Sequence, residues 1–153
     1  MKKAIIFDLD GTLWDTSNET QKIWSEVAKQ YNLKNSNYKI NDIMGMTKEE
    51  IIECLFKNDR ELGNNFITEC QKKENEYFAI NGGHIYNNTL ATIQDLYNEF
   101  ELYIVSNCQS GYIESFLQYY TLGKYFKDFE CSGNTGEEKS KNITRILHRN
   151  NIS

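Results

Sequence analysis

The segment that decides the fold reads Lys3-Ala4-Ile5-Ile6-Phe7-Asp8-Leu9-Asp10-Gly11-Thr12. Its apolar residues are mostly β-branched or aromatic, which predicts a buried strand, and the glycine marks where that strand ends. Side chains along a strand repeat every two residues, so Asp8 and Asp10 start out on one face. Two like charges at the end of a hydrophobic strand cost free energy unless a cation or a reaction needs them. The pair is therefore a functional candidate.

The composition is that of a globular protein with one core. The chain has 153 residues, of which 39% are hydrophobic and 25% charged. No segment reaches the length of a membrane span, and the first apolar run is too short for a signal peptide, so we expect a cytoplasmic protein without a membrane partner. The net charge of −5 argues against a nucleic-acid partner. The cysteines show no C-x-x-C spacing and are expected to be buried, reduced thiols: Cys54, Cys70, Cys108 and Cys131.

Residues 15–82 carry helical signals and no strand signal. Apolar residues at helical spacing predict a helix over about residues 17–32, with Thr16 and Glu19 at capping-box spacing. A polar link over residues 32–41 follows, and a second capping box at Thr47 and Glu50 opens a short helix. A third helix is expected over about residues 64–79, and a turn follows it at Asn81-Gly82-Gly83-His84.

From residue 88 onward, helices and strands alternate. The pattern predicts strands at 102–107 and within 125–131, and helices at 88–100, 110–120 and 139–150. Such alternation indicates an α/β fold with a parallel sheet. We therefore predict a Rossmann-like parallel-sheet core formed by residues 1–14 and 83–153, with an all-helical domain of residues 15–82 inserted after the first strand.

The candidate site lies where the predicted strands end, because ligands of open parallel sheets bind beyond the C-terminal ends of the strands. Three such ends are visible: the Asp8–Thr12 segment, the pair Ser106-Asn107, and the loop of residues 132–139. Together they offer two carboxylates, a hydroxyl with backbone N–H groups, and the ammonium group of Lys139. This set suits a phosphate and a divalent cation, and paired aspartates favour Mg²⁺, which would neutralise their repulsion.

These residues resemble the motifs of the haloacid dehalogenase-like (HAD) hydrolase superfamily, and the resemblance covers nearly the whole chain. The segment Asp8-Leu9-Asp10-Gly11-Thr12 is similar to the first motif, D-x-D-G-T. Ser106, after Ile104-Val105, is similar to the Ser or Thr of the second motif, and Lys139 to the lysine that opens a helix in the third. The helical block falls where the type-1 helical cap of the superfamily is inserted.

The resemblance implies a Mg²⁺-dependent phosphatase that hydrolyses a small phosphorylated metabolite through an aspartyl-phosphate. Asp8 would be the nucleophile, and Asp10 the general acid and then the general base. The Asp8 carboxylate and the Asp10 carbonyl would bind Mg²⁺, while Ser106 and Lys139 would hold the phosphoryl oxygens. The phosphate site would be completed by Gly11, Thr12 and Asn107. A phosphomutase of the same family, which would share the two aspartates, is the alternative.

The fourth motif of the superfamily, a G-D-x-x-x-D type segment that supplies carboxylates to Mg²⁺, has no counterpart. The last aspartate is Asp128, and the chain stops at Ser153, where that strand would begin. We therefore expect a truncated form of a longer protein, with the Asp8 strand left as an unprotected edge and with impaired metal affinity and turnover. A catalytically impaired fragment that retains only phosphate binding is the other alternative.

Several of these residues also have ordinary structural interpretations. Ser106 could cap a strand end, and Lys139 could be an exposed lysine. The segment at 133–140 is close to a P-loop, but Glu138 stands where the second glycine is required. Trp14 fits a cap hinge and a core position equally well. The loop at 45–48 could dock an anion or simply cap a helix.

Overall fold

The structure, a computed structural model, describes residues 3–33 and 38–152. A three-stranded parallel sheet in the order β1-β4-β5 lies at its centre, formed by β1 (Lys3–Phe7), β4 (Phe100–Ser106) and β5 (Phe126–Cys131). In register, Phe7 of β1 lies beside Ile104 of β4, and Ser106 lies beside Cys131 of β5. The C-terminal ends of the three strands therefore meet at one edge. Among the described strands, β1 is at the side of the sheet.

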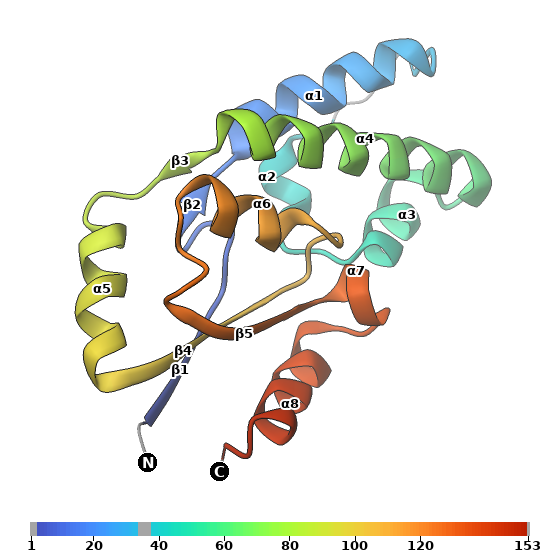
Figure 1. Ribbon diagram of the computed structural model, residues 1–153. Coiled ribbons are helices and arrows are strands. Elements are labelled where there is room, and N and C mark those ends of the chain that lie inside the picture. The colour runs from blue at the N-terminus through green and yellow to red at the C-terminus, as the bar shows by residue number, and fades with distance from the viewer. Residues whose placement is uncertain (1–2, 34–37, 153) are drawn as a thin grey trace.

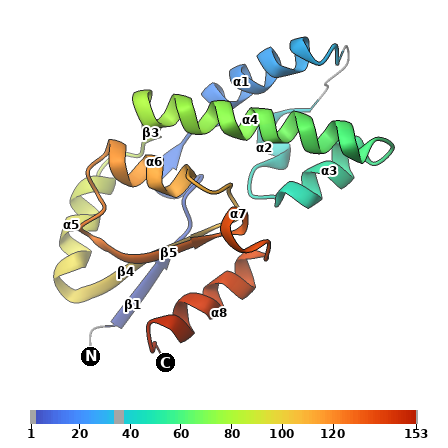
Figure 2. The ribbon, with the colours of Figure 1, turned by 45° about the vertical axis from the view of Figure 1, so that its right-hand side comes forward.

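Eight helices are described, and all but the short α7 fall into three groups. In chain order they are α1 (Ser17–Gln30), α2 (Ile40–Ile43), α3 (Lys48–Phe56), α4 (Arg60–Asn81), α5 (Thr89–Glu99), α6 (Tyr112–Tyr119), α7 (Ser132–Thr135) and α8 (Lys139–Arg149). Helices α5 and α6 pack on one face of the sheet and α8 on the other (Figures 1 and 2). On β4, Leu102 and Ile104 pack in the core on the α5 and α6 side, whereas Tyr103 and Val105 pack in the core on the α8 side. This alternation gives the predicted α/β, Rossmann-like core, with helices on both faces of a parallel sheet.

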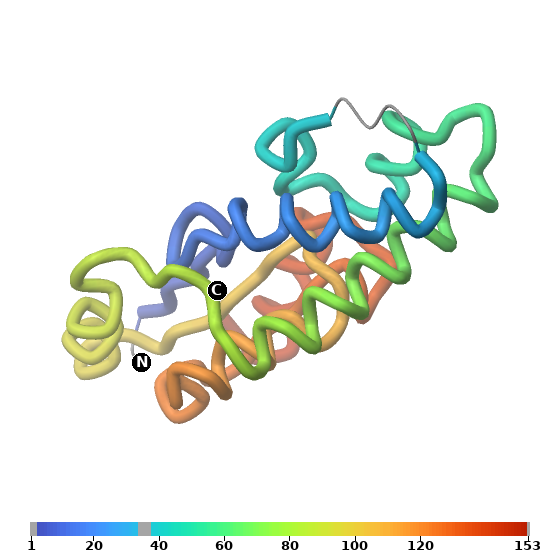
Figure 3. Tube along the Cα trace, turned by 90° about the horizontal axis from the view of Figure 1, so that it is seen from above, coloured from blue at the N-terminus to red at the C-terminus, as the bar shows by residue number. Residues whose placement is uncertain are grey.

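Helices α1–α4 pack around a core of their own, beyond the C-terminal ends of the strands. Viewed from above, α1 and α4 lie side by side (Figure 3). The largest residues of this core are Trp24 of α1 and Phe66 of α4, whose rings meet edge to face with centroids 5.6 Å apart. The two ends of the helical block are joined by a short antiparallel pair, β2 (Trp14–Asp15) with β3 (His84–Ile85). The domain boundaries at 14/15 and 82/83 stay a prediction.

The expected helix caps have different outcomes. The capping box of α3 is confirmed, since the Thr47 hydroxyl accepts from the Glu50 amide and the Glu50 carboxylate accepts from the Thr47 amide. The box at Thr16 and Glu19 is wrong, because the Thr16 side chain makes no cap bond and pairs with Tyr112 instead. Helix α4 begins four residues earlier than expected, because Asp59 accepts from the Leu62 amide as its N-cap.

Other differences concern short elements. Helices α2 and α7 have four residues each, too few for a periodic pattern to reveal them. The predicted turn over residues 81–84 is shorter than expected: Gly82 and Gly83 connect α4 to β3, whereas Asn81 ends the helix and His84 begins the strand. Asp15 adds a strand residue to the block expected to be all-helical. Part of the predicted link, residues 34–37, lies outside the described residues. Cys54 is exposed, not buried as predicted, because it lies outside the apolar stripe of α3. None of the described helices combines the length and apolarity needed to cross a bilayer.

Candidate active site

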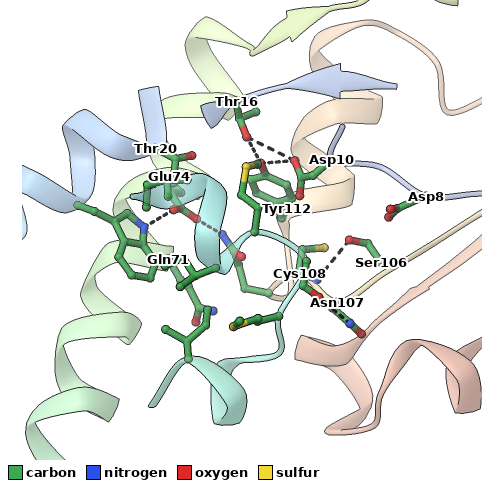
Figure 4. A pocket seen from close by; sticks show the side chains of 18 of the residues that line it. Asp8, Asp10, Thr16, Thr20, Gln71, Glu74, Ser106, Asn107, Cys108 and Tyr112 are labelled. Atoms are coloured by element: carbon green, nitrogen blue, oxygen red, sulfur yellow. Dashed lines mark hydrogen bonds between the residues drawn. The ribbon is translucent and has the colours of Figure 1, made fainter. Parts of the chain in front are cut away.

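A pocket of about 90 Å³ lies between the strand ends and the helical block (Figure 4). Its sheet side comprises the loops after β1 and β4 and the start of α8, with Asp8, Asp10, Ser106, Asn107 and Lys139 among the lining residues. Its other side comprises residues of α1–α4 and the loop after α2, among them Thr20, Trp24, Gly45, Gln71 and Glu74. Five of the residues predicted for the site are thus brought together, from three separate parts of the chain.

Asp8 presents an accessible carboxylate beside a cation. Leu9, the residue between the two aspartates, is fully buried in the sheet core, while both aspartates line the pocket. The Asp8 side chain is 42% exposed, and its Oδ1 lies 2.7 Å from the Nζ of Lys139, the first residue of α8. The same oxygen accepts a hydrogen bond from the Leu9 amide at 2.8 Å. An exposed, oriented carboxylate next to an ammonium group can approach an anionic ligand that the ammonium attracts.

Asp10 lies deeper and has a different environment. Its Oδ1 accepts hydrogen bonds from the Trp14 Nε1 at 3.0 Å, the Tyr112 hydroxyl at 2.9 Å and the Thr16 hydroxyl at 3.4 Å. Burial disfavours the charged carboxylate and raises the pKa of Asp10 to about 6, although the three donors act in the opposite direction. The negative charge of Asp8 raises it further. Two neighbouring carboxyl groups in unlike environments can divide the roles of nucleophile and acid.

Ser106 and Asn107 end β4 at the floor of the pocket. Ser106 is only 3% exposed, and its Oγ accepts a hydrogen bond from the Cys108 amide at 3.3 Å. It therefore caps the strand end and lines the pocket as well. The Asn107 side chain donates to the Gly45 carbonyl at 2.9 Å and accepts from the Ser132 hydroxyl at 2.9 Å. Asn107 thus ties the sheet edge to the helical block.

Gly11 and Thr12, which were expected in the phosphate site, do not line the pocket. Both are exposed, and their amides donate inside the loop, from Gly11 to the Trp14 carbonyl and from Thr12 to the Leu9 carbonyl. Gly11 has a φ of +74°, a left-handed conformation that glycine adopts without strain. The structure therefore gives these two residues a role in turning the chain after Asp10.

Sequence reasoning missed three residues of the pocket. Thr16 and Tyr112 bind Asp10, and Glu74 lines the pocket from α4. A signal existed for Glu74, because it falls between Cys70 and Phe78 on the apolar stripe of its helix, where a charged residue is unexpected. Of the two roles considered for Trp14, the core position is confirmed, because its ring is fully buried in the sheet core; its Nε1 also donates to Asp10.

The donor atoms available to a metal ion are few but of the right kind. No group of three or more His, Cys, Asp or Glu side chains suited to a metal occurs within residues 3–33 and 38–152. Mg²⁺ is often bound by only one or two carboxylates, with water and substrate phosphate completing its shell. Of the two predicted ligands, the Asp8 carboxylate is accessible and fits this requirement, and the Asp10 main-chain carbonyl stays a prediction. The Oδ1 of Asp10 already accepts three hydrogen bonds.

A known protein family matches nearly the whole chain. Residues 5–153 match the family described as haloacid dehalogenase-like hydrolase. The chain belongs to this family. The region that matches the HAD-like family contains the residues that resemble its motifs, namely Asp8, Asp10, Ser106 and Lys139.

Individual relatives of this HAD-like chain are distant. It is 27% identical over 128 residues to the pyrophosphatase PpaX of Oceanobacillus iheyensis, an alignment that covers 81% of the chain but only 56% of that protein. A structure from Bacteroides fragilis, provisionally described as a haloacid dehalogenase-like hydrolase, superposes with a TM-score of 0.84 at 21% identity. The alignment covers 100% of this chain and 75% of that protein. A structure from Lactobacillus plantarum, provisionally described as a phosphoglycolate phosphatase, superposes with a TM-score of 0.83 at 18% identity, covering 99% of this chain and 72% of that protein. At these identities the structural likenesses show the fold alone.

Proposed function

We propose that the chain is a Mg²⁺-dependent phosphatase that hydrolyses a small phosphorylated metabolite through an aspartyl-phosphate intermediate. The observation that carries the proposal is the unlike pair of carboxyl groups. Asp8 is accessible and lies 2.7 Å from the ammonium group of Lys139, whereas Asp10 lies deeper, half-buried and hydrogen-bonded, with its pKa raised to about 6. Membership of the HAD-like hydrolases and the similarity to a protein named pyrophosphatase support it.

The first half of the proposed reaction transfers the phosphoryl group to the protein. A carboxylate oxygen of Asp8 attacks phosphorus, and the bond from phosphorus to the alcohol oxygen breaks, with the electron pair leaving on that oxygen. Asp10 donates its proton to the departing oxygen, which then leaves as a neutral alcohol. The raised pKa of Asp10 suits this role, since a carboxyl group of ordinary pKa would hold no proton near neutral pH.

The second half regenerates the protein. The Asp10 carboxylate takes a proton from a water molecule, whose oxygen attacks phosphorus, and the bond to Asp8 breaks to release inorganic phosphate. Lys139 offsets the negative charge of the transferring group, and Ser106 offers its hydroxyl at the end of β4. The helical block, tied to the sheet edge through Asn107 and Gly45, keeps bulk water from the group in transfer.

Mg²⁺ would be held by the Asp8 carboxylate and the Asp10 main-chain carbonyl, with water and the substrate phosphate as its other ligands. When bound, it supplies positive charge that offsets the phosphate charge as Asp8 approaches. Because so few protein ligands are offered, we expect weak Mg²⁺ binding, detectable by calorimetry and reduced in Asp8→Asn.

The direct test is the release of inorganic phosphate from a panel of small phosphate monoesters in the presence of Mg²⁺. We expect release with the parent chain and a loss of at least about a thousand-fold in Asp8→Asn, because the nucleophile is removed. Asp95→Asn, the same change on the exposed face of α5, is the matched control and should leave the rate unchanged. Equal rates in the parent chain and Asp8→Asn would contradict the proposal.

A further inference from the structure

Glu74 is a buried carboxyl group on the wall of the pocket opposite the aspartates. It lies on α4, is 6% exposed, and is directed into the pocket from the helical side, well away from Asp8 in Figure 4. One carboxylate oxygen accepts a hydrogen bond from the Trp24 Nε1, and the other accepts from the Gln109 side chain at 2.7 Å. Glu74 is therefore fixed in place by donors from both the helical block and the sheet.

No cation accompanies this carboxyl group in the described part of the chain. Both of its hydrogen-bond partners are neutral, and no ion pair found there includes it. Among the lining residues, Lys139 is the one basic side chain, and it is paired with Asp8 on the sheet side. A buried carboxylate without a counter-ion is costly, and burial accordingly raises the pKa of Glu74 to about 7, with a smaller contribution from Asp10.

The chemistry of Glu74 restricts what can occupy the helical side of the pocket. A carboxylate has about four acceptor positions, of which Trp24 and Gln109 use two. The ionised form can accept hydrogen bonds from a ligand hydroxyl or ammonium group, and the protonated form can donate one to a hydroxyl. A second anionic group of a ligand would meet either a like charge or a single donor with no cation behind it.

We propose that Glu74 selects the alcohol portion of the substrate, so that the pocket takes small phosphate monoesters whose alcohol carries a hydroxyl or ammonium group and no second anion. This inference rests on the proposed function, because it places the phosphate at Asp8 and Lys139 and leaves the alcohol to face α4. The cavity has a volume of about 90 Å³, and esters of two-carbon alcohols are therefore the ones tested below. Pyrophosphate and phosphoglycolate, the compounds in the names of two similar proteins, both carry a second anionic group, and the Glu74 carboxylate would weaken their binding.

Three esters of nearly equal size test the proposal: 2-hydroxyethyl phosphate, O-phosphoethanolamine and 2-phosphoglycolate. Their binding is measured by calorimetry at pH 8, above the raised pKa of Glu74, on the full chain carrying Asp8→Asn, which cannot form the phosphoenzyme. We expect phosphoglycolate to bind about ten-fold more weakly, or worse, than the other two, because its carboxylate approaches Glu74 in a poorly hydrated site. Phosphoethanolamine should bind at least as tightly as the hydroxyethyl ester.

Glu74→Gln in the same background should reduce this difference to about two- or three-fold, because the amide keeps the shape and removes the charge. Glu76→Gln, the same change on the exposed face of α4, is the matched control and should leave the ten-fold difference intact. If Glu74→Gln does not fold, the ranking of the three esters by the Glu74 protein decides. Binding of phosphoglycolate as tight as that of the other two esters, or no binding of any, overturns the proposal.

Phosphate release by the parent chain from the same three esters separates this inference from the proposed function. Selective binding without release in the presence of Mg²⁺ supports the role of Glu74 and contradicts the phosphatase. Release at equal kcat/KM from all three esters supports the phosphatase and overturns the role of Glu74.

Discussion

Replacing Tyr112 by phenylalanine removes one of the three hydrogen bonds that stabilise the ionised form of Asp10. The Tyr112 hydroxyl donates to Asp10 Oδ1 at 2.9 Å and also lies 2.8 Å from the Thr16 hydroxyl. Among the groups that lower the pKa of Asp10, this hydroxyl has the largest effect. Its loss therefore leaves burial less opposed, and the pKa of Asp10 should rise.

The size of the change follows from the strength of the bond. A hydrogen bond to a charged group contributes about 1.5–3 kcal/mol, and one pKa unit corresponds to about 1.4 kcal/mol. The Thr16 hydroxyl, freed from Tyr112, can donate more directly to Asp10, so the lower end of this range applies. We expect the pKa of Asp10 to move from about 6 to about 7 in Tyr112→Phe.

The assay is a carbon NMR titration of protein labelled at the aspartate carboxyl groups. It is preferable to a pH–rate profile alone, because the substrate phosphate itself titrates near pH 6. Where activity is measured, the fall in kcat/KM with rising pH, caused by deprotonation of the acid, should move upward by the same amount. Tyr119→Phe, on the exposed side of the same helix, is the control. An unchanged or lowered Asp10 pKa in Tyr112→Phe would refute the role of the Tyr112 hydroxyl in stabilising the ionised form of Asp10.

Three further changes probe other parts of the account. Because the pKa of Glu74 is raised in the folded state, the parent protein loses unfolding free energy as the pH rises from about 4.5 to about 7. Glu74→Gln should therefore be more stable than the parent by up to about 3 kcal/mol above about pH 7, and little different below about pH 4.5. Urea unfolding at the two pH values measures the difference. Gly133→Ala should lose about 1–3 kcal/mol of unfolding free energy, since its Cβ would lie 2.1 Å from the Ser110 nitrogen, whereas the Cβ of Gly123→Ala would meet nothing within 4 Å. Lys139→Met should weaken the binding of inorganic phosphate about a hundred-fold in calorimetry, whereas Lys141→Met, the control, should have little effect. Equally small effects of the two changes would contradict the role of Lys139 in binding phosphate.

The sheet and its active edge were predictable because their signals are local. The apolar run before Asp8 and the one before Ser106 each specify a strand within a few residues, and parallel pairing then brings their ends together. The helices with long apolar stripes were equally predictable. Membership of the HAD-like family agrees with the spacing of the motifs. The positions of Asp8 and Lys139 beside each other follow from that topology.

The deeper parts of the pocket were not predictable, because they depend on contacts across about a hundred residues or between the two cores. The Thr16 hydroxyl bonds to Tyr112 rather than capping its own helix, a choice set by tertiary packing against Asp10. Gly11 and Thr12 were placed in the phosphate site by motif alone, whereas the turn they form uses their amides internally. Local pattern identifies a residue type, but it does not show which partner a donor finds.

The most direct test of the central claim is the covalent intermediate itself. The full chain is incubated with Mg²⁺ and a small phosphate monoester or acyl phosphate, quenched in acid, and digested, and the phosphorylated peptide is located by mass spectrometry. We expect one phosphoryl group on Asp8, labile to hydroxylamine as an acyl phosphate is, and absent from Asp8→Asn. Phosphate release without any phosphorylated Asp8, or a phosphoryl group on another residue, would contradict it.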